Sequence, residues 1–271
     1  MFKLRKESGI DLIHTFWLSE TTLIGLLFRK LTGVPVIATA MGQDIKRQNR
    51  YLWLLRFFKF ELITLSGFQA NSLQGIFRTN FQKVIPFGID LSLYRQKQAK
   101  RTIDILAVGS LNKIKNYSHF VEIVNSLARV FPGLNCGIIG EGNERGQIEK
   151  LILSYGLEKR IRLFGLLKYE EVLEKMEESK ILLHSSVFEG QGLVINEALA
   201  AGAYVVTYPV GTAWNMQNRK LRTGKTIEEL EQHVKNILFE PKPDFSPEII
   251  ITIDETCREY TDIYNSLVLI G

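Results

Sequence analysis

Two glutamates stand close together in the segment FEGQGLVINEALAAG, which runs from Phe188 to Gly202. Glu189 lies beside a glycine pair, and Glu197 follows after seven intervening residues, inside an apolar stretch with helical character. Backbone N–H groups at a helix start suit a phosphate or diphosphate, and a carboxylate accepts hydrogen bonds from sugar hydroxyls. The segment therefore predicts either a site for a phosphorylated sugar ligand or, more simply, a loop charge and a solvent-facing glutamate.

The elements that must position this segment are short apolar strands that alternate with helices. In the first third of the chain, strands are expected at 11–16, 34–41, 61–65 and 83–88. A helix is expected over 19–31, with Ser19 as its N-cap and Gly33 as its stop signal. Because the strand runs are apolar throughout, they predict parallel strands buried on both faces.

A second series of strands and helices follows a polar stretch at 90–102, which we interpret as a linker. Strands are expected at 104–110, 134–140, 161–165, 181–186 and 203–209, with helices at 116–131, 143–156, 169–180 and 192–202. The sequence thus predicts an α/β fold with two Rossmann-like domains, residues 1–95 and 96–271. Ligands of such sheets bind at the carboxyl ends of the strands, where the glutamate segment is expected to lie.

Composition limits the class of protein. The chain has 271 residues, 45% of them hydrophobic, which is enough for two modest packed domains. Its two cysteines, Cys136 and Cys257, offer neither a disulfide framework nor metal-ligand spacing. The first residues lack the apolar core of a signal peptide, and no run approaches the roughly 20 apolar residues that span a bilayer. We therefore expect a cytoplasmic protein.

The formal net charge of +5 favours anionic partners. One segment, residues 46–60, interleaves basic residues with aromatic and leucine side chains. Such a helix either lies against a membrane at its inner face or packs into the core with its basic residues at the rim. Peripheral membrane contact through residues 46–60 is accordingly one expectation.

Five motifs in register, VIPFGID, VGSLNKIKN, IIGEGNER, IRLFG and FEGQGLVINEALAAGAYVV, resemble the nucleotide-sugar-binding domain of GT-B glycosyltransferases. The resemblance is to family 4, the retaining "glycosyl transferases group 1". It covers roughly residues 11–264 and is strongest over 108–206. It implies a hexosyltransferase that moves a sugar from a nucleoside diphosphate sugar to a saccharide or lipid-linked acceptor, in surface polysaccharide or glycoconjugate synthesis. It implies no nucleic acid partner.

The resemblance also implies roles for individual residues. Glu189 would contact the transferred sugar, Glu197 would hold the ribose, and Lys115 would neutralise the leaving diphosphate, with Lys113 as a nearby alternative. His14, at the end of the first expected strand, would contact the sugar or an acceptor group, unless it is a structural histidine. The remaining residues expected at the donor are Gly109, Ser110, Gly140, Gln191, Gly192, Leu193 and Val194.

The chain departs from the family pattern at several positions. Ser110 stands where the family usually has an arginine, so a phosphate-binding cation is missing or comes from Arg219, Lys220 or Arg222. Phe16 replaces the second histidine of the family's H-x-H pattern. In the segment ATAMGQDI, only Gly42 and Asp44 remain of the family's His-Gly-Ser-Asp. The family's first strands and glycine-rich turn are also expected to be absent, which would leave a truncated N-terminal domain.

Metal chemistry has no support in the sequence. The chain contains no Asp-x-Asp pair, and its four histidines share no ligand spacing, so we expect neither a metal nor another cofactor. Two alternatives to a transferase stay open, namely an inactive or binding-only GT-B remnant and another GT-B enzyme such as a sugar-nucleotide epimerase. The motifs leave the nucleotide base, the sugar and the acceptor open.

Overall fold

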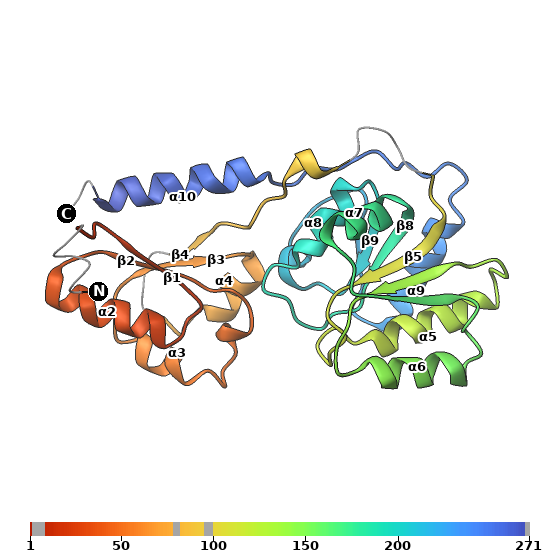
Figure 1. Ribbon diagram of the computed structural model, residues 1–271, viewed down its shortest axis with the longest axis horizontal. Helices are drawn as coiled ribbons and strands as arrows, with labels where there is room; N and C mark the ends of the chain where they lie inside the picture. Colours follow the sequence, from red (N-terminus) through yellow and green to blue (C-terminus); the bar gives the residue numbers. More distant parts are fainter. Residues whose placement is uncertain (2–8, 78–81, 95–99, 269–271) are drawn as a thin grey trace. The chain divides into compact units, whose positions relative to one another are not determined.

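The computed structural model describes residues 1, 9–77, 82–94 and 100–268, and it contains two compact units (Figure 1). Unit 1 comprises residues 1–88, 189–191 and 253–271, and unit 2 comprises residues 89–188 and 192–252. The boundary expected after residue 95 falls outside the described residues and stays a prediction. Unit 1 takes in the last helix of the chain as well as its first strands.

Unit 1 is built on a parallel sheet in the order β1-β2-β3-β4. Its strands are β1 (Ile13–Phe16), β2 (Val36–Thr39), β3 (Glu61–Thr64) and β4 (Gln82–Val84), and its helices are α2 (Glu20–Thr32), α3 (Arg50–Leu55), α4 (Gly67–Leu73) and α10 (Ile253–Val268). Figure 1 shows α10 on one side of this sheet and α2 and α3 on the other.

Alternation along β1 explains the two layers of unit 1. A side chain added to Gly25 of α2 would meet Ile13, Thr15 and Val36, so α2 packs closely on that face of the sheet. The opposite face carries Ile37, which packs with Tyr260 of α10. As expected, Ser19 caps α2 by accepting a hydrogen bond from Thr21 N, and Gly33 ends the helix in the left-handed conformation.

Unit 2 is built on a larger parallel sheet in the order β10-β9-β8-β5-β6-β7. Its strands are β5 (Ile103–Val108), β6 (Cys136–Ile139), β7 (Ile161–Gly165), β8 (Ser179–His184), β9 (Tyr204–Thr207) and β10 (Leu221–Thr223). Its helices are α5 (Tyr117–Ala128), α6 (Arg145–Ser154), α7 (Tyr169–Glu177), α8 (Leu193–Ala200) and α9 (Ile227–Leu238).

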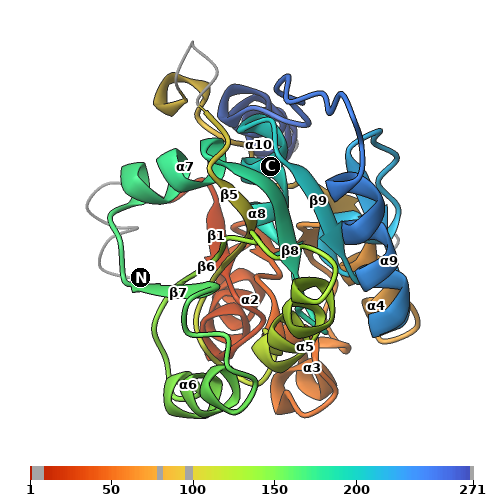
Figure 2. The same cartoon turned by 90° about the vertical axis from the view of Figure 1, so that its right-hand side faces the viewer.

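Two hydrophobic clusters cover the two faces of the unit 2 sheet. Ile105 packs with α5, α6 and α9, whereas its neighbour Leu106 packs with α7 and α8. Figure 2 shows α5 and α6 together on one side of the strands and α7 on the other. The predicted α/β architecture with two parallel, Rossmann-like sheets is confirmed. Strand β10 was not predicted, because a three-residue strand with an arginine at its centre has no apolar run.

Among the described residues, no helix is long and apolar enough to cross a membrane.

Candidate functional site

Glycines shape the carboxyl edge of the unit 2 sheet. Gly109 follows β5 with φ 144°, and Gly140 follows β6 with φ 140°. A Cβ atom on Gly140 would lie 2.0 Å from the carbonyl oxygen of Gly109, so the two loops approach closely and only glycine fits there. The predicted residues Gly109 and Gly140 therefore lie side by side.

Lys115 lies above this glycine edge. A Cβ atom on Gly109 would lie 3.5 Å from Lys115 Nζ, which places the ammonium group over the end of β5. The loop that carries Lys115 is fixed because Ser185 Oγ donates to the Lys115 carbonyl at 2.8 Å and Tyr117 donates to the Gly109 carbonyl at 2.8 Å. Ser110 is exposed on the same loop. This arrangement places the Lys115 ammonium next to the backbone of Gly109.

The start of α8 lies at the same edge of unit 2, after β8. Its N-cap residue, Gly192, has φ 77° and offers no side-chain cap to the helix. The first N–H groups of a helix have no partner within the helix, so the backbone at Leu193 and Val194 is suited to an anionic ligand. Leu193 and Val194 are thus the first residues of a helix, as the sequence predicts, and their role in binding stays a prediction.

Glu197 is one turn into α8 and is buried. Tyr169, the first residue of α7, donates a hydrogen bond to Glu197 Oε1 at 2.9 Å. Burial raises the pKa of Glu197, and the hydrogen bond from Tyr169 partly opposes that effect. Burial and the charge of Glu197 also raise the pKa of Tyr94, whose buried hydroxyl has no hydrogen-bond partner among the described residues. The solvent-facing alternative for Glu197 is wrong.

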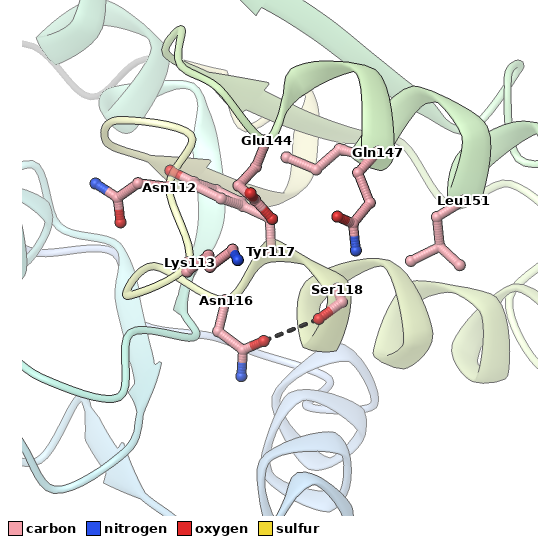
Figure 3. Close-up of a pocket in the computed structure, with 9 residues that line it drawn as sticks. Asn112, Lys113, Asn116, Tyr117, Ser118, Glu144, Gln147 and Leu151 are labelled. Atoms are coloured by element: carbon pink, nitrogen blue, oxygen red, sulfur yellow. Dashed lines mark hydrogen bonds between the residues drawn. The ribbon is translucent and has the colours of Figure 1, made fainter.

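A separate hollow of about 350 Å³ lies between the starts of α5 and α6. Figure 3 shows Glu144 and Gln147 on the α6 side of it and Asn116 on the α5 side, where Ser118 donates to Asn116 Oδ1 at 2.8 Å. Lys113 also lines it. Lys113 and Lys115 therefore lie in different surroundings although they are only two positions apart in the sequence. Apart from Lys113, the alternative to Lys115, none of the residues predicted at the donor lines this hollow.

His14 lies within unit 1, on β1. Its Nδ1 is 2.6 Å from the Tyr264 hydroxyl, and its Nε2 is 2.8 Å from Thr39 Oγ1. Burial lowers the pKa of His14 to about 4, so the ring is neutral at pH 7. Because hydroxyl groups engage both ring nitrogens, this geometry favours the structural alternative for His14, in which it joins α10 to the sheet.

Glu189 and Gln191 also belong to unit 1, although Gly192 belongs to unit 2. The Gln191 side chain is paired with the backbone of Phe87, since its Nε2 donates to Phe87 O at 2.6 Å and its Oε1 accepts from Phe87 N at 2.9 Å. A Cβ atom on Gly190 would lie 2.8 Å from Gly42 Cα. Gly190 is therefore required by the chain's own backbone.

Comparison with known proteins places the chain in a family. Residues 92–239 match the model of the family "Glycosyl transferases group 1". The chain is 30% identical over 140 residues to 2-deoxystreptamine glucosyltransferase of Streptomyces kanamyceticus, a match that covers 50% of this chain and 36% of that enzyme.

Solved structures agree in fold. A glycosyltransferase from Rickettsia africae ESF-5 gives a TM-score of 0.77 at 16% identity, over 98% of this chain and 79% of that one. Anabaena HepE in complex with UDP gives a TM-score of 0.75 at 16% identity, over 99% of this chain and 79% of that one.

The chain belongs to the glycosyl transferases group 1 family. Its α/β fold with two parallel sheets is the GT-B fold that the sequence predicts. The matches span less than half of the length of the first three curated relatives, between 31 and 46%.

Two of the three residues that the sequence offers in place of the missing arginine, Arg219 and Lys220, lie at the wrong edge of the sheet for that role. Arg219 and Lys220 come directly before β10, so they lie at the amino edge of the parallel sheet, opposite the edge that carries Lys115. Arg219 pairs there with Asp244 at 2.5 Å and with Glu248 at 2.5 Å. Lys220 is buried and donates to the Ser246 carbonyl.

The sequence missed two residues of these sites, Tyr169 and Tyr94, and the role of a third, Asp44. Tyr169 stands 28 residues before Glu197, and Tyr94 lies in the expected linker, so neither follows a pattern that points to the glutamate. Asp44 was considered only as the remnant of a catalytic loop. Its carboxylate instead accepts hydrogen bonds from the backbone N–H groups of Leu18, Met41 and Gly42 at 2.7 to 3.2 Å. An Asx-type signal next to a glycine is the only hint of this that the sequence contains.

Proposed function

We propose that this glycosyltransferase moves a hexose-type sugar, with retention, from a nucleoside diphosphate sugar to a saccharide or lipid-linked acceptor in surface polysaccharide or glycoconjugate synthesis. One observation carries the proposal: within unit 2, the Lys115 ammonium, the uncapped start of α8 and the buried Glu197 share the carboxyl edge of one parallel sheet. The UDP complex of the similar fold in Anabaena HepE supports a nucleotide ligand.

The proposal assigns a role to each predicted residue. Glu197 binds the ribose hydroxyls through Oε2, while Tyr169 keeps Oε1 in place. The backbone at Gly109, Ser110, Gly140 and Gln191–Val194 meets the diphosphate and sugar, and Glu189 contacts the transferred sugar. Lys115 stabilises the negative charge that develops on the diphosphate as the glycosidic bond breaks.

No metal or other cofactor is part of this proposal. Lys115 and the dipole of α8 supply positive charge where a divalent cation would otherwise be needed. We expect turnover to be unchanged when EDTA removes divalent cations. A loss of turnover that Mg²⁺ or Mn²⁺ restores would contradict this part of the proposal.

Lys115 provides the test that separates a transferase from a binding-only protein. We expect Lys115→Ala to lower turnover, either transfer or slow donor hydrolysis, by about two to three orders of magnitude while donor affinity falls about tenfold. Lys113→Ala is the matched control, because Lys113 lines the hollow between α5 and α6, and its effect should be severalfold at most. UDP- and GDP-sugars are compared by calorimetry and by release of the nucleoside diphosphate.

Two results would overturn the transferase proposal. Equal losses in affinity and turnover would mean that Lys115 binds the ground state and the transition state alike. Donor binding without turnover in the parent chain, with any donor, would favour the binding-only remnant, an alternative motivated by Ser110. Interconversion of the donor into its epimer without release of diphosphate would favour the epimerase.

We also propose peripheral contact with the inner face of a membrane through residues 46–60. Leu52 and Leu55 of α3 are buried, whereas Trp53 is 59% exposed and Phe57 is 66% exposed. The Arg56 guanidinium lies 5.4 Å from the Trp53 ring centre and 4.8 Å from that of Phe57. An aromatic pair with a basic rim is suited to anionic lipid head groups.

Vesicle sedimentation tests the membrane contact. The parent chain should sediment with phosphatidylcholine vesicles that contain phosphatidylglycerol, and a Trp53→Ala/Phe57→Ala variant should bind them at least about tenfold more weakly. Phe239→Ala, which removes an exposed aromatic side chain of unit 2, is the control. Equal sedimentation of parent and double variant would exclude this surface.

A further inference from the structure

A second hollow, of about 840 Å³, lies within unit 1 where β1 and β2 end. Its lining includes the aromatic rings of Phe16, Trp17 and Tyr51. The polar side chains of Glu20, Gln43 and Gln48 line it as well. Phe16 and Trp17 are about half exposed. Large apolar faces next to hydrogen-bonding groups are the usual composition of a small-molecule site.

The backbone at Trp17 is strained. Its φ is 75°, in the left-handed region that a bulky L-residue rarely adopts. Glycine would take this conformation without cost, yet the chain holds a tryptophan there whose side chain is 49% exposed. Strain of this kind persists only where the surrounding structure enforces it, and it is concentrated at functional sites.

Hydrogen bonds around Trp17 enforce its left-handed backbone conformation. The Trp17 N–H donates to Thr39 O at 3.0 Å, and the Trp17 carbonyl accepts from Thr22 Oγ1 at 2.8 Å. The next residue, Leu18, is fully buried and its N–H donates to Asp44 Oδ2 at 2.8 Å. Asn49 Nδ2 donates to the Leu18 carbonyl at 2.7 Å. The fold therefore fixes the backbone of Trp17, which keeps its exposed side chain at the hollow.

We propose that this hollow binds a saccharide ring and that Trp17 is the surface on which the ring stacks. The inference rests on the proposed function, because it makes the acceptor of the reaction a saccharide, recognised through its sugar rather than through a lipid tail. The C–H face of a pyranose is apolar and packs on an aromatic ring, and its hydroxyls are matched by the carboxylate of Glu20 and the amides of Gln43 and Gln48.

The charge of the hollow favours a neutral ligand over a phosphate. The N-terminus of α2 lies at the hollow, but Ser19 already caps it and the Glu20 carboxylate stands in its first turn. Lys46 also lines the hollow, but its positive charge is offset by the carboxylate of Glu20, so no net positive charge remains for an anion. Sugar hydroxyls, in contrast, can donate hydrogen bonds to that carboxylate. A lipid tail has no groups that pair with the three polar side chains of the hollow, whereas a sugar ring does.

Indole N–H signals in NMR spectra of the full chain test this proposal, because the chain has only three tryptophans. The signals of Trp17, Trp53 and Trp214 are assigned by replacing each with Phe. The parent is then titrated with a panel of methyl hexosides and disaccharides, with and without UDP. We expect at least one saccharide to shift the Trp17 signal saturably in the millimolar range and to leave the Trp53 signal unchanged.

Three variants sharpen the test. Trp17→Gly relieves the backbone strain, so the fold should be kept while affinity for the shifting saccharide falls more than tenfold, measured by calorimetry. Trp17→Phe keeps an aromatic ring and should bind within about fivefold of the parent. Trp53→Ala should bind like the parent, since Trp53 is exposed elsewhere on unit 1.

The outcomes that would overturn the inference are distinct from failure of the proposed function. No saccharide shift at Trp17, equal affinity in Trp17→Gly, or a Trp17 signal that responds to phosphatidylglycerol vesicles and not to sugars would each overturn it. A chain that binds UDP-sugar but no saccharide at Trp17 contradicts this inference alone. A chain that binds the saccharide but neither UDP-sugar nor GDP-sugar contradicts the proposed function alone.

Discussion

The two parallel sheets of this chain end in edges of different chemistry. The edge of unit 2 carries Lys115, glycine backbone and the buried Glu197. Tyr169 donates a hydrogen bond to Oε1 of Glu197 and not to Oε2. These groups are suited to a charged ligand. At the edge of unit 1, the polar groups Asp44 and His14 are consumed by internal hydrogen bonds. What unit 1 presents instead is aromatic surface. Under the proposed function, the groups that act on the donor therefore lie in unit 2, and the surface that recognises the saccharide lies in unit 1.

Removing the charge of Asp44 should cause the largest loss of stability, and this loss should fall on unit 1. Asp44→Asn replaces one of the two acceptor oxygens by an NH2 donor. That donor faces the N–H of Met41 and, in addition, the N–H of Leu18 if it replaces Oδ2 or the N–H of Gly42 if it replaces Oδ1. We expect unit 1 to lose about 3 to 6 kcal/mol of stability, since two charge-assisted hydrogen bonds of about 1.5 to 3 kcal/mol each are lost. Amide hydrogen exchange at these residues measures the loss.

The exposed Asp262 of α10 provides the control for Asp44. Asp262→Asn should change exchange by about 0.5 kcal/mol or less. If Asp44→Asn left exchange unchanged and instead reduced turnover, Asp44 would be a catalytic group, and the contrast between the two edges would fail.

Replacing Glu197 should weaken donor binding by about 1.5 to 3 kcal/mol, through loss of charge-assisted hydrogen bonds to the ribose. Because burial raises the pKa of Glu197, its protonation begins at a higher pH than that of an ordinary glutamate. Donor affinity of the parent should therefore fall as the pH falls toward that pKa, and Glu197→Gln should lack this dependence. Calorimetric titration with UDP- and GDP-sugars at several pH values measures both effects.

Glu158→Gln, an exposed loop substitution in unit 2, is the control for Glu197. It should leave both the affinity and its pH dependence as they are in the parent. An unchanged dissociation constant in Glu197→Gln, with the fold intact, would remove Glu197 from the donor site and leave the unit 2 edge without its carboxylate.

The edges also differ in how far the sequence predicts them. In unit 2, apolar runs predict every strand except β10, and the rule that ligands bind at the carboxyl ends of parallel strands predicts the position of the loop before Glu197. Gly109, Lys115 and Gly140 are expected at this edge from the family resemblance. Tyr169 escapes because its contact with Glu197 depends on how α7 packs beside α8, which has no local signal.

In unit 1, the sequence predicts the strands and the caps of α2. It does not predict the hydrogen-bond partners of the polar residues His14 and Asp44. Whether His14 and Asp44 react or hold the fold depends on partners that are far away in the sequence. His14 meets Tyr264 of α10, 250 residues further on, and Asp44 meets Leu18. The positive φ of Trp17 is equally invisible, because tryptophan has no preference for that conformation.

The histidine can be tested through the pH dependence of stability. The folded pKa of His14 is about 4, whereas the unfolded ring titrates near its usual value of 6.5. As the pH falls from 6.5 toward 4, His14 becomes protonated in the unfolded chain but stays neutral in the folded chain. The free energy of unfolding therefore falls across this pH window. We expect a loss of about 1 to 3 kcal/mol in unit 1, allowing for the partial exposure of the ring.

His14→Asn should lack this acid-side loss, and His233→Asn in α9 should retain it. Urea unfolding followed at Trp17 and Trp53, at pH 7 and pH 4.5, compares the three chains. If His14→Asn kept the full loss of stability but abolished turnover at pH 7, the histidine would act in the reaction and not in seating α10.

The smallest effect is expected from Asn196, which precedes Glu197 on α8. Asn196 is 1% exposed, and neither its side-chain oxygen nor its nitrogen has a hydrogen-bond partner among the described residues. Burying an unpaired polar atom costs about 1 to 3 kcal/mol, so Asn196→Leu, which has a similar branching, should stabilise unit 2 by about 1 to 2 kcal/mol after some loss to tighter packing.

Hydrogen exchange in β8 and β9 would measure the gain from Asn196→Leu, with Asn236→Leu on the exposed side of α9 as the control, expected within about 0.5 kcal/mol of the parent. If Asn196→Leu instead destabilised unit 2 and weakened donor binding, a water or a ligand group would have to pair with the Asn196 amide. Asn196 would then belong to the donor site together with Glu197. Unit 2 would contain a buried polar group that pairs only with the ligand, whereas the polar groups Asp44 and His14 of unit 1 pair within the fold.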